Sequence, residues 1–152
     1  MNTFNKIVAM AAFAYTADAA GIRARCRIEN SAGESQGFFV MKQDALDDGS
    51  YGNATVNFGV RDLDAETAHT MVILTNDGGE CLTADTSSPL EILYEGQSSR
   101  WGHIGQRDLA ADGLEISAEM YDGQYAALLE EGIPVACCQL EVKECNRPVP
   151  PQ

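Results

Sequence analysis

Hydrophobic and polar residues alternate along this chain in short runs, and clusters of turn-forming residues separate the runs. In residues 23–28, for example, Ala24, Cys26 and Ile28 alternate with arginines. A period of two places every second side chain on the same face, so each such run predicts a β-strand. Together with short apolar runs, this pattern predicts strands at residues 23–28, 37–43, 55–61, 71–74, 90–94 and 135–142.

Three segments have patterns that need a separate interpretation. Residues 71–74 are uninterrupted Met-Val-Ile-Leu, which predicts a strand covered on both faces. Residues 114–121 alternate between apolar and polar side chains, as a strand with one buried face does. For residues 124–131 we expect one or two turns of helix.

Turn-forming residues gather at residues 47–53 and 76–79, between the predicted strands. Many short strands separated by such turns are typical of an antiparallel sandwich or barrel. A chain of 152 residues is long enough for one domain with a substantial core. We therefore expect a single all-β domain that spans residues 20–145.

The two ends of the chain are expected to lie outside this domain. Lys6 precedes a nine-residue apolar run, and small residues follow at Ala17 and Ala19. This pattern predicts a secretory signal peptide at residues 1–19, with a buried N-terminal helix as the alternative. Residues 146–152 are rich in proline, which cannot donate to a sheet, and we expect a disordered tail there.

The charge and the cysteine content indicate which partners and which cellular compartment to expect. The formal net charge of −13 argues against nucleic acid or an anionic membrane as a partner, since both carry phosphates. All five cysteines follow the predicted signal peptide, and disulfides persist in secreted domains. Asn53 begins an Asn-Ala-Thr sequon beside a turn, which makes it a candidate glycosylation site. The prediction is an acidic, secreted, extracellular protein.

Several short motifs follow one another in a recognisable order: Cys26 in the first predicted strand, then Gly37 and Gln43, then Leu63 followed by Ala68-His69. In this order they resemble the opening hairpin and the Gly-Leu…Leu-His segment of the Cu/Zn superoxide dismutase family. The resemblance implies a Greek-key β-barrel or sandwich. The other residues that carry it are Cys81, His103-Ile104-Gly105, Asp112-Gly113 and Ile133.

The same resemblance implies that most metal ligands of that family are missing. Copper and zinc in this family are held mainly by imidazole groups. The chain has two histidines, and only His103 falls on a zinc-ligand position. We therefore expect no metal cofactor. By the resemblance, the other copper positions are Val72, Leu74, and Leu140 or Glu141; the bridging position falls near Thr86, and the other zinc positions are Tyr94 and Gln106.

The two histidines lead to different expectations. By the resemblance, His69 occupies a structural position and should be hydrogen bonded. His103 is a weak metal candidate, which would bind zinc together with acidic neighbours such as Asp108 or Asp112. A surface histidine near carboxylates is the alternative.

The cysteines are expected to be structural. Cys26 shares a face with Ala24 and Ile28, which predicts a buried free thiol. Four disulfide candidates remain, which allow three pairings. By the resemblance, Cys81 should bond to the C-terminal region, and the other two cysteines would close a short loop there. A cysteine-based metal site is the alternative. The four candidates are Cys81, Cys137, Cys138 and Cys145.

These observations favour a pseudoenzyme, a secreted interaction module that binds an extracellular protein through residues 81–101, with a homodimer as a further expectation. Trp101 beside Arg100 marks either an exposed contact surface or packing at the end of the barrel, and we favour packing. The first alternative is a superoxide dismutase with altered ligands for copper or zinc and residual activity. The second is another β-sandwich with an accidental similarity.

Overall fold

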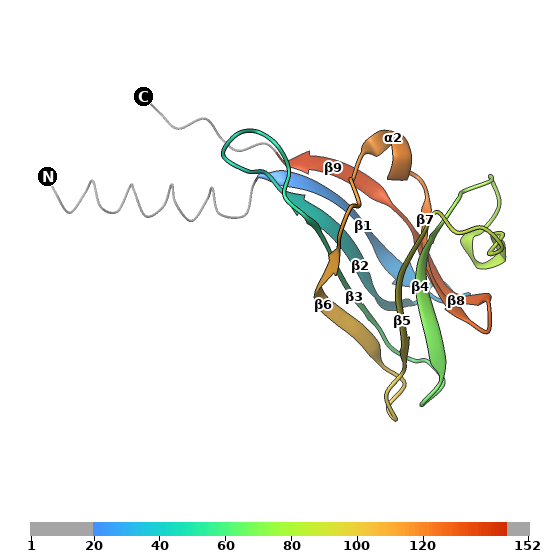
Figure 1. The fold of residues 1–152 in the computed structure, drawn as a ribbon. Coiled ribbons are helices and arrows are strands. Elements are labelled where there is room, and N and C mark those ends of the chain that lie inside the picture. The colour runs from blue at the N-terminus through green and yellow to red at the C-terminus, as the bar shows by residue number, and fades with distance from the viewer. Residues whose placement is uncertain (1–19, 146–152) are drawn as a thin grey trace, which may run out of the picture.

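The computed structural model describes residues 20–145, so the predicted signal peptide and the Pro-rich tail lie outside the described residues. The regular secondary structure of this part of the chain is almost entirely β-strand (Figure 1). The strands are β1 (Gly21–Glu29), β2 (Ser35–Asp44), β3 (Ala54–Val60), β4 (Ala68–Leu74), β5 (Glu91–Gln97), β6 (Ile104–Ala111), β7 (Tyr125–Glu130), β8 (Ile133–Gln139) and β9 (Glu141–Cys145). Two short helices are η1 (Cys81–Thr83) and α2 (Ala118–Tyr121).

Eight strands form an antiparallel, nearly closed barrel in the order β5-β4-β7-β8-β1-β2-β3-β6, and β9 pairs with β1 beyond the end of β8. The pairs β3–β6 and β4–β7 join strands that are not consecutive, so the chain crosses the ends of the barrel as in Greek-key connections. The predicted all-β barrel is confirmed. Between β5 and β6, a hydrogen bond from Gln106 Nε2 to Tyr94 Oη spans 3.2 Å across the open seam.

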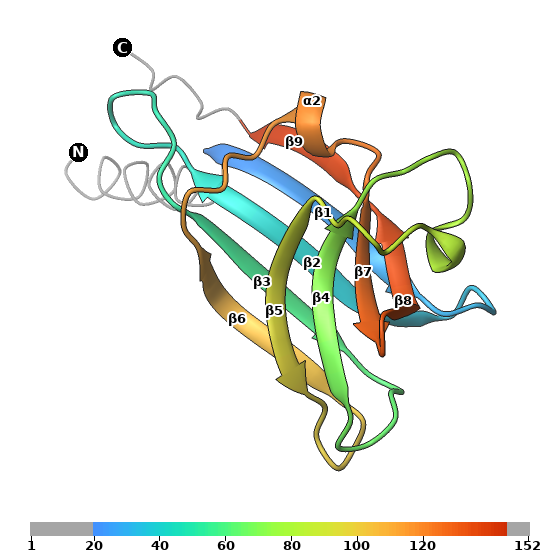
Figure 2. The same ribbon diagram turned by 45° about the vertical axis from the view of Figure 1, so that its right-hand side comes forward.

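The barrel has one core inside and a second core outside three of its strands. In β4, Met71 and Ile73 belong to the interior core, whereas Val72 and Leu74 belong to the outer one. The segment between β4 and β5, which contains η1, lies beside β7 and β8 (Figure 2) and contributes Ala84 to the outer core. Since all four residues of this run are buried, the prediction that residues 71–74 are covered on both faces is confirmed.

The same two-sided burial explains why the helix expected at residues 124–131 is wrong. This segment forms β7, in which Ala126 and Leu128 face the interior core while Tyr125, Ala127 and Leu129 face the outer one. A strand with two apolar neighbours needs no alternation, and a short apolar run of this kind has no period that separates strand from helix.

Two other segments differ from their predictions. Residues 114–121 form no long strand: Ile116 N–H donates to Gln43 Oε1, and Ser117 caps α2 through a bond from Met120 N–H. The strand expected at residues 135–142 is divided, because Leu140 N–H donates to the Gln124 carbonyl at the break between β8 and β9. Strand β6 has no regular alternation, since its pairing with β3 contains a bulge, and the sequence pattern missed it.

The cysteines pair in a way that corrects the expectation for Cys26. Cys26 is not a free thiol but is bonded to Cys138, and Cys81 is bonded to Cys137. Cys145 is the free cysteine, so the short C-terminal disulfide loop is also wrong. Neighbouring residues of a strand point to opposite faces, and Cys138 therefore lies in the interior core while Cys137 lies in the outer one.

This pairing can be tested by freeing one partner at a time. Cys137→Ser should leave Cys81 open to iodoacetamide, and Cys138→Ser should leave Cys26 open. Removal of both Cys81 and Cys137 by serine should lower the unfolding free energy by about 2–4 kcal/mol in urea. Cys145→Ser, the matched control, should change neither the other thiols nor stability. Labelling of Cys26 in Cys137→Ser would contradict the pairing.

One end of the barrel holds a buried tyrosine beside an acid. Tyr121 is 1% exposed, and its hydroxyl donates to Glu91 Oε1 at 3.3 Å. Burial, and then the negative charge of Glu91, raise the pKa of Tyr121 to about 12. Because the unfolded chain has a pKa of about 10 for this phenol, this group stabilises the fold fully below pH 10, and the contribution is lost as pH rises towards 12.

In Tyr121→Phe, the unfolding free energy should therefore fall less between about pH 10 and pH 12 than in the wild type. Urea unfolding at each pH measures it. Ultraviolet titration of the wild type should show a phenol component with a midpoint near pH 12, and this component should disappear in the variant. A wild-type titration without that component would contradict the assignment.

Candidate functional site

The mapped copper positions on β4 are part of a closed apolar cluster. Val72 and Leu74 are 1% and 0% exposed, and both pack in the outer core. The segment between β4 and β5 is fixed over this cluster by the Cys81–Cys137 disulfide. Aliphatic side chains offer no lone pair to a metal, so this region works as packing. The buried members of the outer core are Val72, Leu74, Ala84, Tyr125, Ala127, Leu129 and Cys137.

The remaining mapped positions are divided among other parts of the molecule. Tyr94 and Gln106 bond to each other at the seam, and Leu140 is buried in the interior core. Thr86 donates its hydroxyl hydrogen to the carbonyl of Gly132 at 2.8 Å, and Glu141 forms an ion pair with Lys143. Each side chain has a structural partner of its own, and the positions do not form one centre.

His103 is exposed at the start of β6, where its backbone N–H donates to Ser99 Oγ at 3.2 Å. Within residues 20–145, no group of three or more His, Cys, Asp or Glu side chains is arranged to hold a metal ion. The structure thus does not bring Asp108 or Asp112 together with His103 as a three-ligand site. His69 is 3% exposed, and its Nδ1 lies 2.8 Å from the Thr67 carbonyl, which confirms the expected hydrogen bond.

His103 instead lies at a groove of about 610 Å³ on the outer surface of β2, β3 and β6. We call it the glycine groove, because glycines form much of its floor. A Cβ at Gly37 would overlap the carbonyl oxygen of Gly59, and a Cβ at Gly105 would lie 2.9 Å from the Phe58 carbonyl oxygen. The close strands therefore exclude side chains here. The groove is lined by Ser35, Gln36, Gly37, Phe38, Gly59, Val60, Arg61, His103, Ile104 and Gly105.

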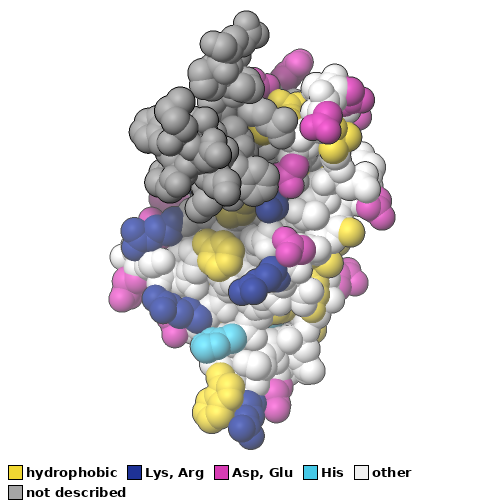
Figure 3. All heavy atoms as spheres, turned by 90° about the vertical axis from the view of Figure 1, so that its left-hand side faces the viewer, with side chains coloured by type: hydrophobic (Ala, Val, Ile, Leu, Met, Phe, Trp, Pro, Cys, Tyr) yellow, Lys and Arg dark blue, Asp and Glu magenta, His cyan; other side chains and the backbone are white. Residues whose placement is uncertain are grey.

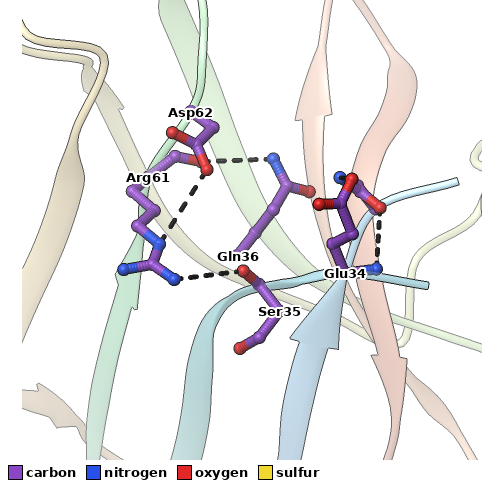
Figure 4. A network of polar contacts seen from close by, with 6 residues as sticks. Glu34, Ser35, Gln36, Arg61 and Asp62 are labelled. Carbon is purple, nitrogen blue, oxygen red and sulfur yellow. Dashed lines mark hydrogen bonds and ion pairs between the residues drawn. The ribbon is translucent and has the colours of Figure 1, made fainter. Parts of the chain in front are cut away.

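One wall of the glycine groove carries a fixed positive charge. The Arg61 guanidinium donates to the Ser35 carbonyl at 3.3 Å and lies 3.9 Å from Asp62 (Figure 4). Gln36 Nε2 donates to the Arg61 carbonyl at 3.2 Å, while the buried Gln36 Oε1 has no hydrogen-bond partner in the described part of the chain. These contacts direct the Arg61 guanidinium toward Ser35 and Asp62 at the edge of the groove lining.

Trp101 is exposed, so the expected packing at the barrel end is wrong. Its side chain is 71% exposed, and the Arg100 guanidinium lies 4.7 Å from the ring centroid. An exposed tryptophan stacked with arginine is typical of contact surfaces. Asn53 is also exposed, directly before β3, so its amide is accessible to solvent.

Comparison with known proteins adds no family to this description. The chain matches no protein-family model, no curated protein and no solved structure. In residues 20–145, no helix has both the length and the apolar character that a membrane span requires.

If the side chains at the mapped copper positions serve as core packing, truncating them should lower the unfolding free energy. Leu74→Ala should lower the unfolding free energy by about 2–5 kcal/mol, because it opens a cavity in the outer core. The control Ile92→Ala, at a residue that is 60% exposed, should change it by less than about 0.5 kcal/mol. Urea unfolding measures both. Equal, small effects would show that the outer core contributes little.

Proposed function

We propose that this protein is a secreted, non-catalytic binding module built on a barrel of the Cu/Zn superoxide dismutase type. The observation that carries the proposal is the position of Val72 and Leu74 in the closed outer core, where the resemblance would place copper ligands. The barrel with its crossing connections and the order of the motifs support the fold type. A barrel retained without its ligands favours a role in recognition.

The proposed binding surface lies around the turn that leads into β6. Trp101 offers a large exposed ring next to Arg100, and the glycine groove begins close by at His103. Aromatic and arginine side chains supply much of the binding energy at protein interfaces. Two disulfides within the described residues support an extracellular location. The proposed partner is an extracellular protein.

Metal content and superoxide consumption test the non-catalytic part of this proposal. The signal-free protein should hold no stoichiometric copper or zinc after loading and dialysis, and loading should add no superoxide consumption. About one tightly held copper per chain with activity would support the alternative, a dismutase with altered ligands. In that case His103→Ala should lower the zinc content, because His103 is the mapped zinc ligand that the chain retains.

The binding part is tested on the immobilised protein in its own extracellular medium. Trp101→Ala should retain less of a captured partner than the wild type, with an unchanged circular dichroism spectrum. Ile92→Ala, which removes another exposed apolar side chain on β5, should retain as much as the wild type. Equal retention by both variants would place the contact elsewhere.

A further inference from the structure

The positive charges of the described chain lie together on one side of the barrel. Lys6 and Arg147 lie outside residues 20–145, and the other eight of the ten lysines and arginines lie on or beside β9, β1, β2, β3 and β6. Strands β4, β5, β7 and β8 carry none, although the formal net charge is −13. We call these eight residues the basic face: Arg23, Arg25, Arg27, Lys42, Arg61, Arg100, Arg107 and Lys143.

Strand register places several of these charges side by side. Arg23 is opposite Lys42 on β2 and opposite Lys143 on β9, so three cationic residues form a row across the sheet. Arg25 and Arg27 follow on the same side of β1, and both are exposed. Like charges on directly opposite residues destabilise a sheet. The row therefore concentrates positive charge at one place on a chain that has 23 acidic residues.

Acidic residues within the basic face offset only part of this charge. Glu141 lies 3.0 Å from Lys143, and Asp62 lies 3.9 Å from Arg61. Glu29 and Asp44 are exposed at the ends of β1 and β2. Arg25 is itself opposite Glu141 on β9, whereas the residue opposite Arg27 on β2 is the apolar Phe38.

The basic face is continuous with an apolar feature. Phe38 is 49% exposed, is opposite Arg27 on β1 and Gly59 on β3, and forms a wall of the glycine groove. In the space-filling view, basic side chains surround an exposed hydrophobic side chain and lie near the histidine (Figure 3). A ligand for this surface needs negative charge together with a large apolar side chain.

We propose that the basic face binds an extended acidic segment of a partner protein, with carboxylates over β9, β1 and β2 and a hydrophobic side chain in the glycine groove. The inference rests on the proposed role in binding and names the chemistry of the partner. A long polyanion fits less well, because it would extend past the face and meet the acidic remainder of the molecule. Strand β1 has nine residues and is about 30 Å long, which suits a segment of similar length.

The probe is a fluorescein-labelled peptide of nine glutamates with one central phenylalanine, followed by fluorescence anisotropy at low salt. The wild type should bind it saturably, and affinity should fall as salt rises. The double variant R25A/R27A should bind at least about tenfold more weakly. The matched control Glu95→Gln on β5 adds no positive charge to the face and should bind as the wild type does.

A second arm tests the groove. Phe38→Ser should weaken the phenylalanine peptide to the level of an all-glutamate peptide, which should itself bind the wild type more weakly. Circular dichroism confirms that each variant is folded. Absence of saturable binding at low salt, or equal affinity of R25A/R27A and the wild type, would overturn the inference.

Two further ligands separate the sources of negative charge. Tighter binding of a single-stranded DNA oligonucleotide or of sulfated dextran than of the peptide would overturn the choice of an acidic polypeptide. Sedimentation equilibrium that shows a salt-sensitive dimer, lost in R25A/R27A, would replace the partner with a second copy of this chain. Failure of peptide binding leaves the metal and Trp101 results untouched, so the proposed function would stand or fall separately.

Discussion

The structure depends on the burial of both faces of β4 and β7. Their inward side chains fill the barrel, and their outward side chains pack under the segment between β4 and β5. Apolar surface removed from water contributes about 25 cal/mol per Å² to folding, so the second buried face adds to the hydrophobic contribution of these central strands. The Cys81–Cys137 disulfide fixes the covering segment to β8 and thereby keeps the second face dry.

This arrangement also determines what the barrel is suited to do. A metal centre at the outward face of β4 would need polar ligands and access for a small molecule. Val72 and Leu74 supply neither, and their burial adds stability instead. The proposed recognition surface lies on the opposite half of the barrel, where the strands bear exposed arginines, Phe38 and the glycine groove. One half of the barrel carries the buried outer core, and the other half presents exposed charged side chains and a groove.

The sequence pattern predicted β-strands that have one solvent-exposed face. Residues 55–61 alternate because one side of β3 meets solvent, so β3 and the inward direction of Val56 were readable. Both faces of β4 and β7 are buried, but the short Met-Val-Ile-Leu run of β4 is typical of a buried strand, whereas the Ala-Ala-Leu-Leu run of β7 also fits a helix. Strand β6 was missed because its bulge breaks the period. Local pattern cannot supply what depends on neighbours distant in sequence.

The candidate site was predictable only in part. The sequence indicated His103 as a metal candidate and Trp101 as a possible contact residue. The exposure of Trp101, however, depends on how the turn before β6 folds. The opposite directions of Cys137 and Cys138 followed from strand alternation, and this signal could have assigned them to different partners. The basic face needed the strand order, since Lys143 and Lys42 become neighbours of Arg23 only in the assembled sheet.

Amide hydrogen exchange followed by mass spectrometry tests the central claim, that two-sided burial of β4 and β7 holds the structure together. Residues 70–74 and 125–129 should exchange most slowly, through global unfolding, and β5 and β6 at the open seam should exchange faster. Exchange in β4 and β7 as fast as at the seam would contradict the account, because the outer core would then add nothing to their protection.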